Sequence, residues 1–548
     1  MRVTKGAQII AGTALLALAV AACGGGGGGS TGSSPGATTG ASDAPVRMEI
    51  GEPQKLFYPS DTTETEGAEV LAALFSPLVS YNENKEVVNE VAQSIETEDN
   101  KVWTIKLKPG YTWHNGEKLI AQNYVDAWNF ASNQENVQSA SYFFGRIAGY
   151  ADLNPGEGKT PSTKEMSGLK AVDDLTLEVT LSKPFSQFPV MLGYTAFYPL
   201  PKAAFGPDGK VTEEFAAKPI GQGQFSIDKP YGKGTDQTID LTRYDAFAGA
   251  KPKFSKLQFK IYTSTETAYN DLRGGELDII DQLAASSISS AKSDLGERYI
   301  EQPDAGIGYI GFPLKYNKEY ENVKVREAIA MAIDRKTIAE KVFSGTRAPA
   351  DDFINPAIAG YKQGACTVCI FDPAKAKEVY TAANGPKKLE LGYNADGGHK
   401  EWIEAVAINL RASLGIEVTV KPFEKFQAIL DELDAKKYTG MFRMGWAIDY
   451  PSPENYLTPI FSTEAAKTGS NYAGYSSKEF DDLLVKGDTA ETPEAGLEAY
   501  RQAADVLNKE LPYVPVYFYK INAGYSEHLK SVKINLLNQV EWESVEKA

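Results

Sequence analysis

The stretch that decides the fold is KLELGYNADGGHKEWIEAVAINLRASLGIEVTV, residues 388–420. Leu389, Leu391 and Tyr393 alternate along its first part and predict a strand. Apolar residues then recur at helical spacing, at Ile403, Val406, Ala407, Leu410 and Leu414. Gly415 is placed to end that helix, and IEVTV reads as a second strand. A strand, a helix and a strand in about 30 residues form a βαβ crossover, so the sequence predicts an α/β fold with parallel strands.

A further strand is expected at 440–448, GMFRMGWAI, where the sequence DYPSP ends it. Ligands of open α/β sheets lie outside the carboxyl ends of the strands. Asn394 and Asp449 each directly follow a predicted strand. We therefore expect both side chains to face a crevice in which a ligand binds.

Other segments are mixed in character. Residues 102–107 and 175–181 alternate between polar and apolar, as strands do. An apolar stripe at helical spacing runs over 325–333. Asp334 is placed to cap a second helix, which Gly345 would follow.

The N-terminus has the pattern of an exported protein. Arg2 and Lys5 precede an apolar run at 9–20, which is shorter than the roughly 20 residues that cross a bilayer. This pattern predicts a signal peptide over residues 1–22. The small residues before Cys23 resemble a bacterial lipoprotein signal, in which the cysteine becomes the lipidated N-terminus. The alternative is an ordinary cleavage site beside an unrelated cysteine.

Residues 23–45 are rich in Gly and Ser and carry almost no large apolar side chain. Such a segment cannot bury enough surface to offset its own ordering entropy. A flexible chain of this length spans roughly 25 Å. We therefore expect a tether and an extracytoplasmic protein, anchored to the cell membrane by lipid on Cys23.

Charge excludes some partners. The chain has 56 basic and 72 acidic residues and a net charge of −16, which becomes −18 when Arg2 and Lys5 leave with the signal peptide. Nucleic-acid binding rests on basic residues that neutralise phosphates, and anionic lipid attracts basic segments. We expect neither kind of contact.

Cys366 and Cys369, in GACTVCIFDP, have three interpretations. A zinc site needs four ligands, and the three histidines of the chain offer no second pair nearby. A thioredoxin-like redox site needs a helix that begins within the motif, whereas the next helix here is expected to begin at Asp372-Pro373. A small disulfide that pins a loop is the favoured interpretation.

Motifs of catalysis are missing. The sequence has no H-E-x-x-H, no G-x-S-x-G and no Walker loop. The one match to G-x-G-x-x-G, GIGYIG at 306–311, is followed by an extended segment with Pro313 instead of a helix that could receive a pyrophosphate. We expect no enzyme activity, no metal and no cofactor, although 72 acidic residues leave many carboxylate pairs that a motif search does not test.

Seven segments in a fixed order carry a resemblance to a known family. They are WTIKLKPGYTWHNGEKLIAQNYVDAWNF (103–130), LKAVDDLTLEVTLSKP (169–184), PIGQGQF (219–225), LRGGELDI (272–279), NVKVREAIAMAIDRKTI (322–338), RMGWAIDY (443–450) and LPYVPVYFY (511–519). The chain resembles the bacterial extracellular solute-binding proteins of the dipeptide/oligopeptide class, which serve ABC importers. It departs from that pattern at Gln222, where a Thr is usual, and in LTRYDAF, which lacks an Asn-Pro pair.

The resemblance implies a periplasmic-binding-protein-like fold of two lobes that close on a ligand about hinge strands. The segments YIGFPLKYN and YVPVYFYKINA would be the crossing strands. The implied division is lobe one at 46–80, 171–311 and 522–548, an inserted subdomain at 81–170, and lobe two at 312–521.

The same resemblance implies several site residues. Asp449, in Gly-Trp-x-x-Asp, would pair with the α-ammonium of a peptide; the alternative is that it caps the turn before Pro451. Arg443 would hold the ligand carboxylate or form a surface ion pair. His399 would serve longer peptides in the same way or be a solvated loop residue. Trp446 would pack the cleft wall.

Further contacts are implied from the first lobe. Tyr142 would line the cleft or pack in a core. Thr63, Glu64 and Thr65 would lend main-chain hydrogen bonds to a peptide that adds as a strand. A cysteine pair found in some relatives is absent, since Ala447 takes one position.

The expected function is therefore capture of a peptide and its delivery to the permease subunits of an ABC transporter by a lipid-anchored, monomeric binding protein. Two alternatives stay open. The same fold can bind another solute, such as an oligosaccharide, a metal chelate or a signalling peptide, and an anchored hydrolase is the alternative of another class.

Overall fold

The computed structural model describes residues 44–548, apart from the side chain of Thr468. The predicted signal peptide, the lipidation site Cys23 and all but the end of the predicted tether lie outside the described residues.

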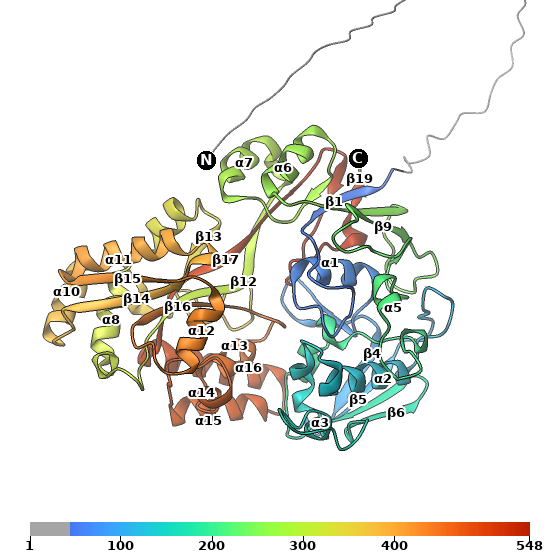
Figure 1. The fold of residues 1–548 in the computed structure, drawn as a ribbon, viewed down its shortest axis with the longest axis horizontal. Coiled ribbons are helices and arrows are strands. Elements are labelled where there is room, and N and C mark those ends of the chain that lie inside the picture. Colours follow the sequence, from blue (N-terminus) through green and yellow to red (C-terminus); the bar gives the residue numbers. More distant parts are fainter. Residues whose placement is uncertain (1–43) are drawn as a thin grey trace, which may run out of the picture. The chain divides into compact units, whose positions relative to one another are not determined.

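One mixed sheet links two lobes of the described chain (Figure 1). Within residues 44–548 its strand order is β15-β14-β16-β12-β17-β11-β1-β10-β9-β8, and β13 pairs with β17. The bounds are β1 Val46–Ile50, β8 Phe225–Ile227, β9 Thr238–Arg243, β10 Lys256–Ile261, β11 Ile279–Ile280, β12 Tyr299–Gly311, β13 Arg347–Pro349, β14 Lys388–Asn394, β15 Glu417–Phe423, β16 Met441–Ala447 and β17 Tyr513–Tyr525.

Strands β12 and β17 belong to both lobes. They pair antiparallel from Tyr299 opposite Gly524 to Gly311 opposite Tyr513. At one end β17 pairs with β11 of the first lobe, and at the other β12 pairs with β16 of the second. Figure 1 shows these two long strands crossing the gap between the lobes, which is the arrangement expected of a hinge.

The GIGYIG segment lies inside β12, so its glycines have a packing role. A Cβ atom on Gly308 would lie 2.2 Å from the ring of Tyr517, and one on Gly311 would lie 2.3 Å from the ring of Phe442. Both contacts are impossible for a real side chain. The glycines let aromatic rings of β17 and β16 cover β12, and the dinucleotide reading is excluded because no helix begins in the segment.

The predicted βαβ unit is confirmed. β14 and β15 pair parallel, with Leu389 opposite Val418, and helix α11 (Lys400–Leu414) connects them. Gly415 ends α11 in the left-handed conformation that favours glycine, with φ 71°. β16 adds on the other side of β14, also parallel.

Three smaller sheets accompany the large mixed sheet within residues 44–548, two of them two-stranded, β2-β3 and β18-β19. A four-stranded antiparallel sheet, in the order β4-β5-β7-β6, forms the part of the first lobe that faces α13–α16 in Figure 1. The bounds are β2 Val79–Tyr81, β3 Val87–Asn89, β4 Ala92–Thr97, β5 Val102–Leu107, β6 Leu169–Asp173, β7 Thr176–Thr180, β18 Leu529–Ser531 and β19 Glu546–Lys547. The predicted domain boundaries remain predictions.

Helices cover the sheets on both lobes (Figure 1). Their bounds are α1 Thr65–Leu74, α2 Ala121–Ser132, α3 Tyr150–Leu153, α4 Phe188–Met191, α5 Glu213–Ala217, α6 Thr265–Gly274, α7 Ile288–Leu295, α8 Val323–Met331, α9 Arg335–Thr337, α10 Pro373–Ala382, α12 Phe426–Asp434, α13 Glu454–Phe461, α14 Ala465–Thr468, α15 Lys478–Asp488 and α16 Pro493–Glu510. In residues 44–548 no helix combines the length and the apolar character that a membrane span requires.

Asp334 caps α9 as expected, through a bond from the Thr337 N–H to its carboxylate. The helix it starts is short, because the chain widens into a π-helical turn at Ile338–Val342 before Gly345. The apolar pattern of the sequence could not distinguish an α-helical turn from a π-helical one, because either can leave Ile338 and Ala339 buried, as they are here.

Cys366 and Cys369 are joined by a disulfide, with their Cα atoms 5.3 Å apart. The carbonyl of Cys369 accepts a hydrogen bond from the buried guanidinium of Arg335 at 2.8 Å. The next helix, α10, begins after Asp372, whose carboxylate accepts from the Lys375 N–H. The pair therefore fixes the loop that leads into α10.

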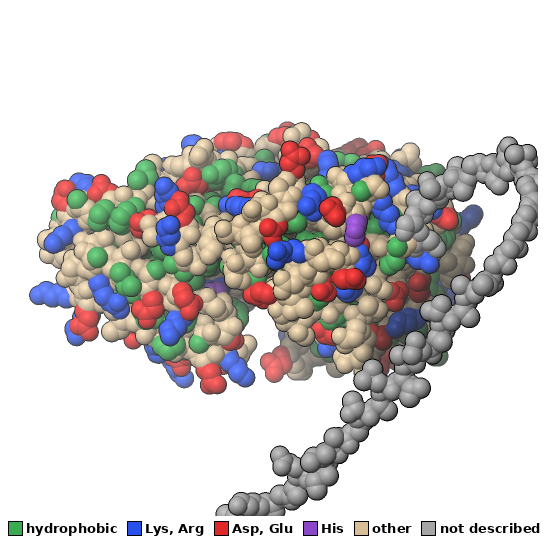
Figure 2. All heavy atoms as spheres, turned by 90° about the horizontal axis from the view of Figure 1, so that it is seen from above, with side chains coloured by type: hydrophobic (Ala, Val, Ile, Leu, Met, Phe, Trp, Pro, Cys, Tyr) green, Lys and Arg blue, Asp and Glu red, His purple; other side chains and the backbone are tan. Residues whose placement is uncertain are grey.

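The lobes also touch at the end away from the hinge strands. Arg146 of the first lobe pairs with Glu454 at 2.6 Å and with Asp488 at 3.4 Å. The Ser186 hydroxyl donates to the carbonyl of Gly487 at 2.8 Å. The space between the lobes is thus bounded by the hinge at one end and by these contacts at the other, and Figure 2 shows a hollow between the two halves.

Candidate ligand-binding site

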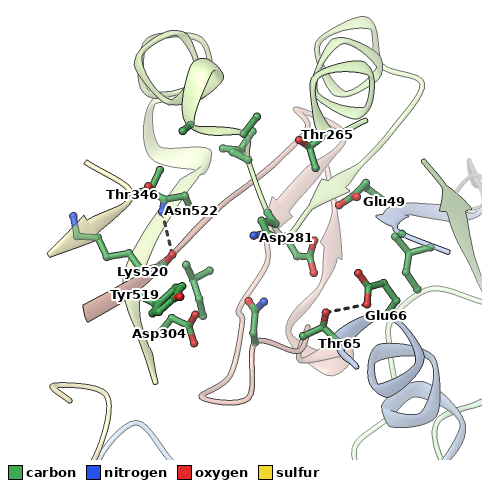
Figure 3. Close-up of a pocket in the computed structure, with 18 of the residues that line it drawn as sticks. Glu49, Thr65, Glu66, Thr265, Asp281, Asp304, Thr346, Tyr519, Lys520 and Asn522 are labelled. Carbon is green, nitrogen blue, oxygen red and sulfur yellow. Dashed lines mark hydrogen bonds between the residues drawn. The ribbon is translucent and has the colours of Figure 1, made fainter. Parts of the chain in front are cut away.

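A cavity of about 530 Å³ lies beside the hinge strands (Figure 3). Residues of the first lobe, from β1, α1 and the segment after β11, form one wall. The opposite wall comes from β12, β13 and β17. Thr65, one of the three residues expected to lie along a bound peptide, lines this cavity.

Glu64 has a structural role at the rim. It is the N-cap of α1, and its carboxylate accepts from the Gly67 N–H at 2.7 Å and from the Gln54 N–H at 3.2 Å. Burial raises the pKa of this carboxyl to about 7. Thr63 and Thr65 are exposed, and the main-chain groups of Thr63 have no hydrogen-bond partner within residues 44–548. The edge 63–65 is thus open to a peptide main chain.

Asp449 follows β16 and is held by one asparagine of α13. Asn455 donates from Nδ2 to the Asp449 carboxylate at 3.1 Å, and its Oδ1 accepts from the Asp449 N–H at 2.9 Å. Burial raises the pKa of Asp449 to about 6, against the opposing effect of Asn455. No cation pairs with this carboxylate within residues 44–548, nor does any main-chain N–H there bond to it, so a turn cap is not what it supplies.

Asn455 was not predicted from the sequence. Its Oδ1 also accepts from the indole of Trp446 at 3.4 Å, so it fixes Trp446 and Asp449 together. Trp446 is half-buried and packs against the core of the second lobe, as expected for a cleft wall. A lone Asn in a helix carries no signal of this role in a single sequence.

Tyr142 comes from the first lobe and lies near enough to Asp449 of the second lobe to feel its charge. Its ring is 60% exposed and stacks on Phe143 with centroids 4.3 Å apart. Burial, and then the charge of Asp449, raise the pKa of the Tyr142 and Tyr194 hydroxyls. Tyr142 is therefore placed on the cleft surface and not in a core.

Arg443, Asn394 and His399 form a second polar group, beside the carboxyl end of β14. Arg443 is 8% exposed and donates to Asn394 Oδ1 at 3.0 Å, while its Nε has no partner among the described residues. This burial excludes the alternative that Arg443 forms a surface ion pair. Its guanidinium keeps an unused donor.

His399 is also buried. Its Nδ1 accepts from the Trp402 indole at 3.2 Å. Burial, and then the charge of Arg443, lower the pKa of His399 to about 3, so the imidazole is neutral at pH 7. A neutral ring with Nδ1 as acceptor carries its hydrogen on Nε2, which can donate to a ligand but supplies no positive charge.

Arg347, on β13, is a cation that the sequence did not reveal. Its guanidinium lies over the ring of Tyr519 at 4.1 Å, and its buried Nε has no partner among the described residues. It lines the cavity of Figure 3 and acts electrostatically on His399 and Asp304. It lies in GTRAPAD, a stretch with no motif, so only the pairing of β13 with β17 brings it to the site.

The site thus has an anionic group at Asp449 and a cationic group at Arg443 and Arg347. Residues 44–548 contain no cluster of three or more His, Cys, Asp or Glu side chains suited to a metal ion. The arrangement suits a ligand that carries both charges, and nothing in it resembles a nucleophile with its base.

Comparison with known proteins identifies the family of the chain. The family model described as bacterial extracellular solute-binding proteins, family 5 Middle, matches residues 86–468. The chain is 26% identical over 534 residues to the oligopeptide-binding protein OppA of Bacillus subtilis, covering 94% of this chain and 95% of that one. It is 26% identical to the periplasmic murein peptide-binding protein MppA of Escherichia coli, covering 85% and 86%.

Solved structures agree on the fold. The unliganded open form of the murein tripeptide-binding protein MppA superposes with a TM-score of 0.79 at 24% identity, covering 92% of this chain and 98% of that one. HbpA2 from Haemophilus parasuis gives a TM-score of 0.78 at 22% identity, with 92% and 99% covered. The expected two-lobed α/β fold is thereby confirmed, and the chain belongs to family 5 of the bacterial extracellular solute-binding proteins.

Proposed function

We propose that this protein binds short peptides with a free N-terminus between its lobes and delivers them to an ABC importer. Family membership and the peptide-binding names of its relatives support this proposal. The observation that carries it is Asp449, a half-buried carboxylate that acts electrostatically on Tyr142 and Tyr194 of the other lobe and pairs with no cation within residues 44–548. A buried charge without a partner is costly, and an α-ammonium would provide that partner.

The other end of the peptide would meet Arg443 and Arg347. Both guanidinium groups keep a buried Nε without a partner in the described residues. A carboxylate accepts two parallel hydrogen bonds from a guanidinium, and such charge-assisted bonds are the strong ones. Residues 443 and 449 are at most about 22 Å apart along an extended chain, which limits a peptide clamped at both ends to a few residues.

The main chain of the peptide would lie along 63–65. The unpaired main-chain groups of Thr63 and the exposed Thr65 support a strand-addition mode, which gives affinity without reading side chains. Glu64 would act through its main chain, because its carboxylate is used to cap α1. Tyr142 and Trp446 would close over the N-terminal residue.

Anchoring and delivery complete the proposal. Lipid on Cys23 would keep the protein at the outer face of the membrane, and the Gly/Ser-rich segment 23–45 would let it turn toward the permease. Two lipid chains are needed for stable anchoring, which lipoprotein modification supplies.

The test is binding by calorimetry after unfolding and refolding to remove co-purified ligand, with native mass spectrometry of the untreated protein to identify that ligand. The proposal predicts bound peptides of a few residues and binding of free, zwitterionic tripeptides to pentapeptides. Recovery of a sugar or a metal chelate, with no peptide binding, would overturn it. Release of peptide fragments on incubation would favour a hydrolase.

A further inference from the structure

The cavity beside the hinge strands has a strongly acidic wall. Glu49, Glu66, Glu69 and Asp281 line it from the first lobe. Figure 3 shows Glu49, Glu66 and Asp281 on this wall. Asp304 lies on the opposite wall, near Arg347, and Lys520 there is already paired with Glu301. The four carboxyls of the first-lobe wall, called the acidic wall here, face the cavity with no basic side chain among them.

Glu49 is the most informative member of the acidic wall. Its side chain is 5% exposed, points into the cavity, and accepts no hydrogen bond from a donor within residues 44–548. Its one neighbour within hydrogen-bond reach is the carboxyl of Asp281. Two acids that share a buried site cannot both be ionised without a counter-charge. The protein therefore keeps an acid pair open to its ligand cavity, and no basic side chain of residues 44–548 forms an ion pair with it.

A neutral acceptor belongs to the same cavity. Asn538 lines the cavity, and its buried Oδ1 accepts no hydrogen bond within residues 44–548. A primary ammonium has three donors in a compact head, and a guanidinium has five. The two carboxyls and this amide oxygen offer acceptors for such a head, and the absence of a metal-type cluster in the described residues argues against a divalent cation.

The acidic wall is within reach of the proposed peptide. Thr65, at the open edge 63–65, lines the same cavity as Glu49 and Asp281. Alternate side chains of a strand laid on that edge point toward the protein and away from it. Asp449 is not among the residues that line this cavity, so the acidic wall is separate from the group proposed for the α-ammonium.

We propose that the acidic wall is a side-chain subsite, and that the protein prefers peptides with a basic side chain, such as lysine or another diamino acid, whose cation lies between Glu49 and Asp281. This inference rests on the proposed function and names its preferred substrate. The cation supplies the counter-charge that the acid pair lacks, while lysine-free peptides still bind through their ends.

Proton release provides a second signature. Burial, and then the charge of Asp281, raise the pKa of Glu49 to about 9, whereas burial raises the pKa of Asp281 to about 6 against the lowering effect of its bond to Glu49. In the ligand-free protein the pair therefore holds a proton at pH 7. The charged groups that face the pair are Glu66 and Glu69 of α1, with Asp304, Arg347 and Lys520 across the cavity. A cation placed between the two carboxyls favours their ionised form, so a lysine peptide expels protons on binding and its norleucine twin does not.

The experiment uses the refolded protein and alanine peptides of three to five residues with one scanned position occupied by lysine, norleucine or glutamate. Calorimetry in buffers of different ionisation enthalpy gives affinity and proton release together. At one position, lysine should bind about tenfold or more tighter than norleucine, with proton release, and glutamate should bind weakest.

The variant Glu49→Gln/Asp281→Asn should lose the lysine preference and the proton release, while its affinity for norleucine peptides stays unchanged. It should also fold well, because it removes a buried acid pair. The control Glu479→Gln/Glu494→Gln makes the same kind of substitution at two exposed carboxylates outside the cavity, and it should keep both signatures.

The results separate the two proposals. Equal affinity for lysine and norleucine at every position, or a preference that survives in Glu49→Gln/Asp281→Asn, overturns the side-chain subsite and leaves peptide binding intact. Failure of every peptide to bind the unmodified protein overturns the proposed function and this inference with it.

Discussion

Asn455 holds Asp449 by two hydrogen bonds, one from its Nδ2 to the carboxylate at 3.1 Å and one from the Asp449 N–H to its Oδ1 at 2.9 Å. The carboxylate is therefore oriented from its own lobe before any ligand arrives. Such preorganisation lowers the free-energy cost of ordering the site when a ligand binds.

Replacement of Asn455 by Ala should weaken binding of peptides with a free N-terminus by about tenfold, since it removes one hydrogen bond to a charged group. Acetylated peptides should lose much less, because they make no ion pair with Asp449. Calorimetry with both peptide forms gives the comparison. An equal loss for both forms would show that Asn455 only stabilises α13.

Affinity should fall on acidification. Burial raises the pKa of Asp449 to about 6 in the ligand-free protein. An α-ammonium needs the ionised carboxylate, so Kd should rise about tenfold per pH unit below that value, measured by calorimetry between pH 4.5 and 8. Asp449→Asn, which has no proton to exchange, should bind weakly with a flat profile.

The contribution of Asp449 to the free energy of unfolding of the ligand-free protein should fall as pH rises, whereas peptide affinity rises. The folded protein keeps a proton on Asp449 that the unfolded chain releases near its ordinary pKa of 3.8. This contribution is complete below that pH and is lost as pH rises through about 6. In thermal unfolding, Asp449→Asn should match the unmodified protein near pH 4 and exceed it above pH 6; a difference that is constant with pH would contradict the raised pKa.

Arg443 should act on the other end of the peptide. Arg443→Gln leaves the bond to Asn394 possible but removes the charge. It should therefore weaken the binding of peptides with a free C-terminal carboxylate by about tenfold to a hundredfold. Amidated peptides should bind the two proteins alike. His399→Gln, which replaces one neutral donor by another, is the matched control and should change little.

The anchor can be tested apart from binding. Cys23→Ala should leave peptide affinity unchanged and release the protein from membranes, because within residues 44–548 no helix can span a bilayer and the net charge disfavours anionic lipid. Fractionation of cells that express each form measures this. Persistent sedimentation of the Cys23→Ala variant with membranes would refute the lipid anchor.

The periodicity of apolar residues predicted the elements of the fold that depend on local sequence pattern. The alternation of Leu389 and Leu391, the stripe of α11 and the stop at Gly415 are signals within one βαβ unit, and the structure confirms them. The pairing of β12 with β17 joins residues about 200 apart, and no local pattern encodes that partnership. It became visible only through resemblance to a family.

The site residues also divide into those that a local sequence pattern predicts and those that only tertiary packing reveals. Asn394 and Asp449 were predicted to follow strands; Asn394 is instead the last residue of β14, while Asp449 does lie just past the end of β16. Asn455, Arg347 and Glu49 lie on a helix, on a short strand and on a first-lobe strand, and only tertiary packing brings them to the cleft. The charge state of His399 was also beyond the sequence, since its low pKa comes from burial beside Arg443.

The central claim is that Asp449 pairs with the α-ammonium of a bound peptide, and a double-mutant cycle tests it most directly. Calorimetry would measure the unmodified protein and Asp449→Ala, each with a free and an N-acetylated peptide. Removal of one partner of a buried charge pair costs about 2–5 kcal/mol, so each single change should weaken binding by about 30-fold to several thousand-fold. Both changes remove one interaction, so their combination should cost little more than either alone. Penalties that simply add would contradict the account and show that Asp449 does not contact the ammonium.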